Sequence, residues 1–165
     1  MFEVKIDSRE LNEGLSRLMQ ASSDLTPVMR SIATALLSHT EANFAAGGRP
    51  KWTAKKDGSP ATLQKSGQLA ASITPSSGRD YAAIGTNKPY AAIHQFGGQT
   101  SPHVIRPKNK KALAFGGKVF KSVNHPGSKM PARPFLPVIN GALQADAAED
   151  VLDLIERHLQ RALAK

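Results

Sequence analysis

Apolar residues recur with helical spacing over two long stretches of the chain. From Thr26 onward they return every three or four positions until Gly47 and Gly48, which predicts a long helix with Thr26 as its N-cap and Pro27 as its first helical residue. The same spacing predicts a second long helix from about Asn140 to Ala162, with acidic residues near its start and basic residues near its end. These two helices are the strongest structural signals in the sequence.

The N-terminal residues show a different pattern. Apolar and polar residues alternate from Phe2 to Ile6, which predicts a short strand, and the spacing of Asp7 and Glu10 is typical of a helix start. Four apolar residues then fall on one face of the predicted helix: Leu11, Leu15, Leu18 and Met19.

Short strands and turns are predicted for the middle of the chain. We expect a hairpin with arms at Ala71–Thr74 and Tyr81–Gly85, and a short helix at Tyr90–Phe96 closed by Gly97 and Gly98 as a left-handed cap. Further strands are predicted at 104–106, 112–115 and 118–123, the last two joined by a turn at Gly116 and Gly117. Together these elements predict an α+β fold, in which a twisted and mainly antiparallel sheet of short strands packs against two long helices.

Length and composition are consistent with a single domain spanning residues 1–165, made in a cytoplasm. The 165 residues suffice to bury a core, and the lack of cysteine excludes disulfides, thiol nucleophiles and Cys-ligated zinc. The sequence shows neither a run of about 18 apolar residues, as a transmembrane helix requires, nor a signal-peptide pattern. We therefore expect a soluble protein with no membrane contact.

The net charge of +9 comes from the middle of the chain. Residues 47–134 hold fifteen Lys and Arg side chains against Asp57 and Asp80 alone, whereas both flanking segments are slightly acidic. This stretch is also rich in Gly and Pro, so we predict two mobile basic loops, at 47–66 and 106–134. Such loops suit either phosphate groups or an acidic protein surface.

No pattern in the sequence indicates catalysis, a cofactor or a metal site. His94, His103 and His125 lack the spacing of a zinc site and have no nearby acidic partner, and the Gly pairs lack the spacing of phosphate-binding loops. Nucleic-acid binding is the stronger alternative, because six aromatic residues are interleaved with the basic ones. We favour the core as the place of these six, with a base-stacking surface as the alternative: Trp52, Tyr81, Tyr90, Phe96, Phe115 and Phe120.

Four motifs in order resemble the phage virion morphogenesis family, the tail completion or tail-terminator-like proteins of Mu-like and related tailed phages. They are the long helix running into Gly48-Arg-Pro-Lys-Trp52, the segments Leu63–Ile73 and Tyr90–Gly98, and Pro131-Ala-Arg-Pro-Phe-Leu136. The resemblance covers nearly the whole chain. The Lys-rich stretch from Lys108 to Lys121 is outside the motifs.

The resemblance implies a non-catalytic structural protein of the phage neck or tail end, joining tail to head. It would form a ring of identical subunits, commonly six, around the DNA channel. Its partners would be copies of itself, tail-tube or head-completion proteins and, non-specifically, packaged DNA. It would act in the host cytoplasm during assembly and remain in the virion. The alternative from another class is a basic DNA-binding accessory protein of a phage or prophage.

Particular residues then receive predicted roles. Trp52 is either an anchor in a neighbouring subunit or a lid over its own core, and prolines aim Arg133 at a carboxylate. Tyr90, His94 and Phe96 are expected to pack the short helix onto the sheet. The partner-contact residues are Trp52, Lys55, Lys56, Lys108, Lys110, Lys111, Lys118 and Arg133. The structural motif residues are Gly67, Tyr90, His94, Phe96, Gly97, Gly98, Pro134 and Phe135.

Overall fold

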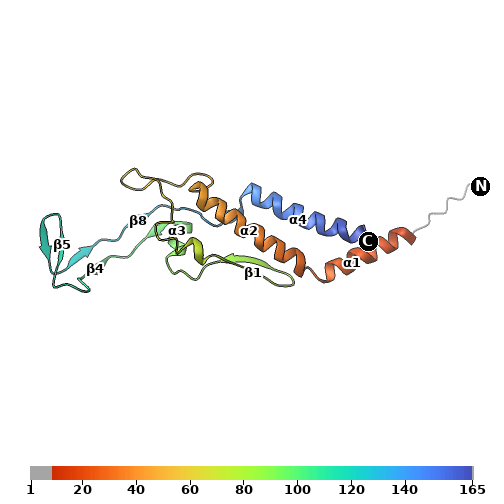
Figure 1. The fold of residues 1–165 in the computed structure, drawn as a ribbon, viewed down its shortest axis with the longest axis horizontal. Coiled ribbons are helices and arrows are strands. Elements are labelled where there is room, and N and C mark those ends of the chain that lie inside the picture. The colour runs from red at the N-terminus through yellow and green to blue at the C-terminus, as the bar shows by residue number, and fades with distance from the viewer. Residues whose placement is uncertain (1–8, 165) are drawn as a thin grey trace, which may run out of the picture.

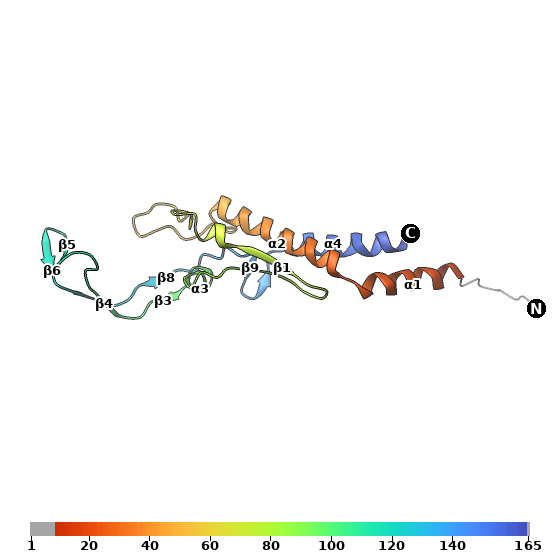
Figure 2. The same ribbon diagram turned by 60° about the horizontal axis from the view of Figure 1, so that its bottom comes forward.

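The computed structural model describes residues 9–164 and shows an elongated molecule (Figures 1 and 2). Its helices are α1 (Arg9–Ser23), α2 (Thr26–Ala46), α3 (Ala91–Phe96) and α4 (Ala145–Leu163). Helices α2 and α4 lie side by side in the middle, α1 extends the molecule at one end, and a narrow arm extends it at the other. The strand predicted at Phe2–Ile6 and the predicted cap at Asp7 lie outside the described residues.

The α+β class is confirmed, and the strands of the described part pair antiparallel in five two-stranded ladders rather than in one continuous sheet. The strands are β1 (Thr74–Ser77), β2 (Ala82–Gly85), β3 (Gly98–Gln99), β4 (His103–Ile105), β5 (Leu113–Phe115), β6 (Lys118–Phe120), β7 (Val123–His125), β8 (Lys129–Met130), β9 (Val138–Ile139) and β10 (Ala142–Leu143). The β1–β2 hairpin packs along α2.

Helix α2 is the centre of the body because it contributes to two apolar clusters. Near its start, Val28, Ile32 and Leu36 are buried against partly exposed residues of β2 and α4. Near its end, Phe44 packs with Trp52 and Phe135, the Phe44 and Phe135 rings stacking at 5.4 Å. Gly47 then ends the helix where the sequence predicts, and it adopts the left-handed conformation.

The start of α2 differs from the prediction. Thr26 is the first helical residue rather than the N-cap, and its backbone N–H donates to the carboxylate of Asp24 at 3.0 Å. Hydrogen bonding from the Thr26 side chain, and then from its backbone N–H, lowers the pKa of Asp24, with a smaller contribution from the charge of Arg79. Asp24, rather than Thr26, therefore supplies a side-chain acceptor at the start of α2, and the donor that it satisfies is the N–H of Thr26 itself.

Helix α4 begins later than predicted, and the short strand predicted at Ala71–Thr74 is also displaced. Asn140 and Gly141 both have positive φ and form the two-residue turn between β9 and β10, so α4 begins only at Ala145. Ala70–Ser72 is a turn of 3-10 helix, closed by the Ser72 hydroxyl donating to the Leu69 carbonyl, and β1 follows at Thr74.

Candidate functional site: a basic arm and its anchor

The arm is one antiparallel ribbon that leaves the body at Gly98 and returns at Met130. Its three ladders are nested: β3 pairs with β8, β4 with β7, and β5 with β6 at the tip. The strand predicted at 118–123 is divided, because 118–120 pairs within the tip and 123–125 pairs with β4. Gly116 and Gly117 both have positive φ and make the predicted tip turn.

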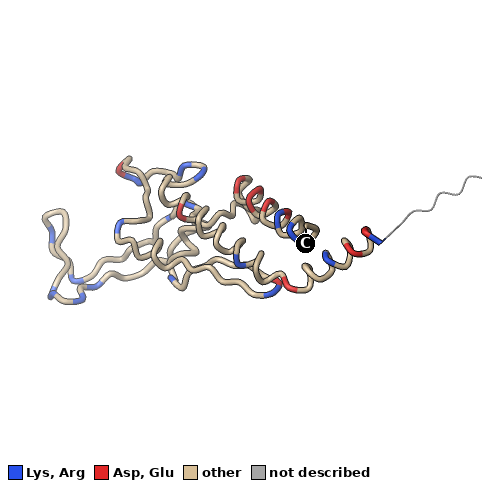
Figure 3. The backbone as a smooth tube through the Cα atoms, turned by 45° about the vertical axis from the view of Figure 1, so that its right-hand side comes forward, with Lys and Arg blue, Asp and Glu red and all other residues tan. Residues whose placement is uncertain are grey.

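The arm carries one sign of charge (Figure 3). Residues 98–130 contain seven Lys and Arg side chains and no Asp or Glu. None of these residues is buried in the subunit. Four large apolar side chains of the arm are more than a third exposed: Val104, Ile105, Phe115 and Val119. The arm is therefore a cationic surface with apolar residues that its own body does not cover.

Most of the aromatic residues assigned to the core are not in it. Of the six interleaved aromatics only Trp52 is buried, while Tyr81, Tyr90, Phe96 and Phe115 are exposed. The rings of Phe115 and Phe120 stack on each other at 4.8 Å across the tip ladder, without a second layer to bury them. The preference for the core is wrong here because a hairpin needs a packing partner to bury a face, and the arm has none within the subunit.

Gln95 anchors the returning strand of the arm to α3. This side chain is 4% exposed, and its Oε1 accepts hydrogen bonds from the backbone N–H groups of Phe135 and Leu136, each at 3.0 Å. Its Nε2 donates to the carbonyl of Val138 at 2.9 Å. One buried amide thus fixes three residues of the segment that leads to α4. The sequence analysis missed it, although Gln95 lies four residues after Ala91, the other buried position of α3.

Gly97 allows the two chains at the base of the arm to approach each other. Its φ is 71° with ψ at −172°, so the predicted left-handed cap is wrong in detail although the need for glycine remains. A Cβ at Gly97 would lie 2.7 Å from the backbone N of Ala132. Next to this contact, the N–H of Arg133 donates to the carbonyl of His94 at 2.7 Å.

Arg133 binds backbone carbonyls, not the carboxylate that was predicted. Its side chain is 7% exposed, and its guanidinium donates to the carbonyls of Thr53 at 3.1 Å and Ala54 at 3.4 Å. No described Asp or Glu forms an ion pair with it. The loop that begins at Gly47 brings these carbonyls to the guanidinium, so Arg133 joins this loop to the base of the arm. Its burial removes it from the exposed contact residues.

Trp52 is the second link between the same two segments. Its ring is buried, packs edge-on against Phe44, and donates from Nε1 to the carbonyl of Pro134 at 2.9 Å. Of the two alternatives for Trp52, the structure supports the lid over its own core. Phe135, predicted as a motif residue, is 1% exposed in the same core.

The residues that pack α3 onto the rest of the subunit are not the ones that were predicted. Phe96 is 76% exposed and Tyr90 is 39% exposed, whereas Ala91 and Gln95 point inward. His94 lies between these cases, with its ring edge-on to Tyr90. Burial lowers the pKa of His94, and the nearby positive charge of Arg133 lowers it further. Tyr90, His94 and Arg133 line a cationic hollow between α3 and the loop, together with Lys55, Lys65 and Ser66.

The exposed residues among those predicted to contact partners lie in two places. Lys55 and Lys56 lie on the loop at 47–66, in a turn where Asp57 accepts hydrogen bonds from the Ser59 hydroxyl and N–H, which lower the pKa of Asp57. Lys108, Lys110, Lys111 and Lys118 lie exposed on the arm. Gly67, in the same loop region, has positive φ and makes a turn before the 3-10 helix.

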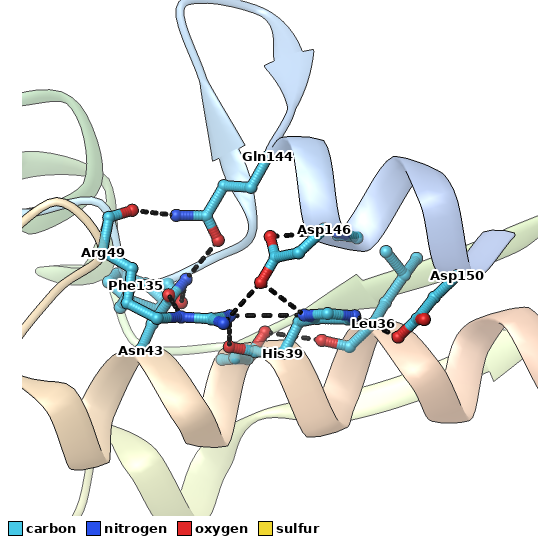
Figure 4. A network of polar contacts seen from close by, with 10 residues as sticks. Leu36, His39, Asn43, Arg49, Phe135, Gln144, Asp146 and Asp150 are labelled. Atoms are coloured by element: carbon cyan, nitrogen blue, oxygen red, sulfur yellow. Dashed lines mark hydrogen bonds and ion pairs between the residues drawn. The ribbon is translucent and has the colours of Figure 1, made fainter.

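A polar network that the sequence analysis missed joins α2 to the start of α4 (Figure 4). Asn43 Nδ2 donates to Gln144 Oε1 and to the carbonyl of Phe135, and Arg49 Nε donates to Asn43 Oδ1 at 2.9 Å. Arg49 also pairs with Asp146. His39 Nε2 lies 2.7 Å from Asp150 Oδ2. The network fixes the position of α4 from its first turn.

The described residues contain no cluster of three His, Cys, Asp or Glu side chains that could hold a metal ion. His103 and His125 face each other across the arm, with rings stacked at 5.1 Å. Between residues 9 and 164, no helix has both the length and the hydropathy that crossing a bilayer requires.

Comparison with known proteins gives a consistent result over almost the whole chain. The phage virion morphogenesis family matches residues 6–160. The chain is 37% identical over 157 residues to "Mu-like prophage FluMu G protein 2" of Haemophilus influenzae, covering 94% of this chain and 97% of that protein. It is 32% identical over 177 residues to "Putative capsid assembly protein G" of Escherichia phage Mu, covering 97% and 95%. No solved structure matches. The chain belongs to the phage virion morphogenesis family.

Proposed function

We propose that this protein completes the tail of a tailed phage and joins it to the head, as a ring of identical subunits around the DNA channel. Membership of the family supports a structural role in phage assembly. The names of the two relatives, a G protein of a Mu-like prophage and a putative capsid assembly protein, support the same role. The protein acts in the host cytoplasm and stays at the neck or tail end of the virion.

The basic arm is the observation that carries the proposal. It projects from the body, has no buried residue, and leaves Val104, Phe115 and Val119 uncovered. An apolar side chain gains stability only when it leaves water, so these residues reach their most stable environment in contact with another molecule. An arm built for contact, rather than for its own core, is what a subunit of an assembly requires.

Deleting the gene from the parent phage or prophage tests the proposal. Electron microscopy of the lysate should show full heads beside unattached or abnormal tails, and a plasmid copy of the gene should restore intact virions. Intact virions without the gene would overturn the proposal. A plasmid copy with Lys108, Lys110 and Lys111 replaced by Glu should fail to complement, whereas the matched replacement of the same three by Arg, which keeps the charge, should succeed.

A DNA-binding accessory protein is the second candidate, favoured by the exposed Phe115 ring among the lysines of the arm. Its affinity for short duplex DNA would fall steeply with salt, with a slope of about −0.9 for each phosphate contact. A titration between 50 mM and 200 mM salt therefore separates the two candidates: tight, steeply salt-dependent binding would favour the DNA-binding role, and weak non-specific binding the assembly role.

A further inference from the structure

Helix α4 has a broad apolar face of which the fold covers only part. Successive residues of a helix are rotated by about 100°, so Ala147, Val151, Leu154 and His158 share the side that packs toward α2 and α1. A second apolar row lies next to this side and is exposed: Leu152 at 65%, Ile155 at 37%, Leu159 at 39% and Leu163 at 47%. A Cβ at Gly14 of α1 would lie 3.7 Å from Leu163 Cδ2, so the end of the row adjoins α1, while the described residues leave the row largely exposed.

Helix α1 has a similar uncovered row. Leu11, Leu15 and Met19 follow one another at intervals of four residues and are 64%, 49% and 74% exposed. Helix α1 runs antiparallel to the end of α4, with His158 Nε2 lying 3.3 Å from the carbonyl of Ala21. Polar residues such as Arg17, Gln20 and Arg161 line a hollow on one side of this helix pair. By helical rotation both exposed apolar rows fall on the opposite side, where they form one surface.

Acidic side chains border that surface along α4. Glu149 precedes Leu152 by three residues and Glu156 follows it by four, so both lie beside the exposed row, with Asp153 one step further round. All three are exposed. Asp146 and Asp150 are engaged with Arg49 and His39. Asp153 pairs with Arg157 at 3.8 Å and Glu156 accepts a hydrogen bond from Gln160 at 2.9 Å, contacts within α4 that leave both residues exposed. The surface, here called the α1–α4 face, is therefore apolar with an acidic edge.

The arm has the complementary composition at the other end of the molecule. Its exposed Val104, Phe115 and Val119 lie among lysines, with no acidic residue between 98 and 130. Figures 1 and 2 place the arm and the α1–α4 face at opposite ends, so the two cannot meet within one subunit. Figure 3 shows the same separation of charge, with the red residues of α4 far from the blue residues of the arm tip.

We propose that the arm of one subunit docks on the α1–α4 face of the next subunit, burying apolar side chains of both and pairing arm lysines with Glu149, Asp153 and Glu156. The partner is a second copy of this chain, and the contact is head-to-tail. A head-to-tail contact uses two different surfaces and leaves one of each free, so it continues from subunit to subunit and closes into a ring when the rotation allows. This inference rests on the proposed ring and assigns its interface.

Charge exchange in the complete protein tests the interface. Variant A replaces Lys108, Lys110 and Lys111 by Glu; variant B replaces Glu149, Asp153 and Glu156 by Lys. Supplied alone to a gene-deleted phage, each variant should give a plaque titre at least about tenfold lower than the wild-type gene gives. The reason is that the arm and the α1–α4 face of neighbouring subunits then carry like charges. A chain with all six replacements should restore the titre, since attraction returns with reversed signs. If circular dichroism shows that all variants are folded and the chain with all six replacements still does not restore the titre, the inference is overturned.

Mixing the two variants gives an independent result. Variant A keeps a normal α1–α4 face and variant B keeps a normal arm, so these two surfaces attract each other. The surfaces left over, the Glu-bearing arm of A and the Lys-bearing face of B, also attract with reversed signs, so a mixture should assemble with A and B in alternation. Light scattering after chromatography should show species in the mixture that are larger than those of either variant alone. If the mixture forms nothing larger than the separate variants while the wild-type protein self-associates, head-to-tail docking is contradicted.

The apolar part of the contact has its own test. Leu152→Gln should reduce the titre while leaving the melting temperature unchanged, because Leu152 is exposed in the subunit. Tyr81→Gln, at an exposed position that belongs to neither surface, is the matched control and should leave the titre unchanged. If head-to-tail assemblies form but gene deletion leaves intact virions, the proposed function fails and this contact stands. If deletion separates heads from tails but charge exchange restores nothing, the contact fails and the function stands.

Discussion

Asn43, in the last turns of α2, donates a hydrogen bond from its side-chain amide to Oε1 of Gln144, the residue directly before α4, at 2.9 Å. Asn43 is fully buried, and its remaining bonds reach Phe135 and Arg49. A buried polar group costs free energy unless it is paired, so each of these partners depends on Asn43. One side chain thus connects the long helix, the segment that returns from the arm, and the start of the C-terminal helix.

Replacing Asn43 with Ala should lower the free energy of unfolding by about 2–3 kcal/mol, because it leaves buried polar groups unpaired and opens a small cavity. Urea unfolding followed by circular dichroism measures the change. Asn109→Ala, at an exposed position on the arm, is the control and should change stability by less than about 0.5 kcal/mol. If Asn43→Ala lowers the free energy of unfolding no more than Asn109→Ala does, the polar network contributes little to stability.

Replacing Gly97 with Ala should lower the free energy of unfolding by about 2–4 kcal/mol and loosen the base of the arm. Positive φ disfavours Ala, and the new Cβ would meet the backbone of Ala132 and Met130 at 2.7 Å and 3.0 Å. The β3–β8 amides should then exchange faster with deuterium. Gly85→Ala is a matched control, because a Cβ at Gly85 meets nothing within 4 Å. If both variants melt like the wild type, the close approach at Gly97 does not constrain the fold.

His94 should make the protein less stable as the solution becomes acidic. Burial first, and then the charge of Arg133, lower the pKa of His94 from its ordinary value of 6.5. The unfolded chain therefore binds a proton at a pH where the folded chain does not, so stability falls as the pH drops below 6.5 toward the folded pKa. Urea midpoints between pH 7.5 and 5 should show this decline, and His94→Asn should flatten part of it. His103→Asn, on the exposed arm, should keep the wild-type profile.

How far the sequence predicts this fold depends on how local each signal is. The apolar period from Val28 to Phe44 and the glycines after it locate α2 correctly, because helix period and helix end are local properties. Asn140-Gly141 is also a local signal, typical of a hairpin turn, but the helical period that continues from Leu143 hides it. Where two local patterns overlap, the prediction assigned the residues to the longer one.

The residues that hold the arm could not be predicted in this way. Gln95, Arg133 and Trp52 bond to backbone groups 40 or more residues away, and no short pattern encodes a bond to a carbonyl. The exposed Phe115 has a related cause. A strand pattern indicates that one face should be buried, but whether the subunit supplies a layer to cover it depends on the tertiary arrangement. The charge of the arm was predictable, since it is a property of composition alone.

Shortening the arm should leave the body intact and remove assembly. In the β4–β7 ladder Ile105 faces Val123, so replacing residues 106–122 with Asn-Gly closes the ribbon by a two-residue turn. No residue of 98–130 is buried, and the links to the body through Gln95, Arg133 and Trp52 lie outside the excised part. The melting temperature should therefore change by less than about 2 °C. The shortened chain should nevertheless fail to restore a gene-deleted phage.

Phe135→Ala provides the opposite case, because it should lower the melting temperature strongly by emptying the core. A shortened chain that melts much lower would mean that the tip stabilises the body, and one that restores the phage would mean that the tip makes no essential contact.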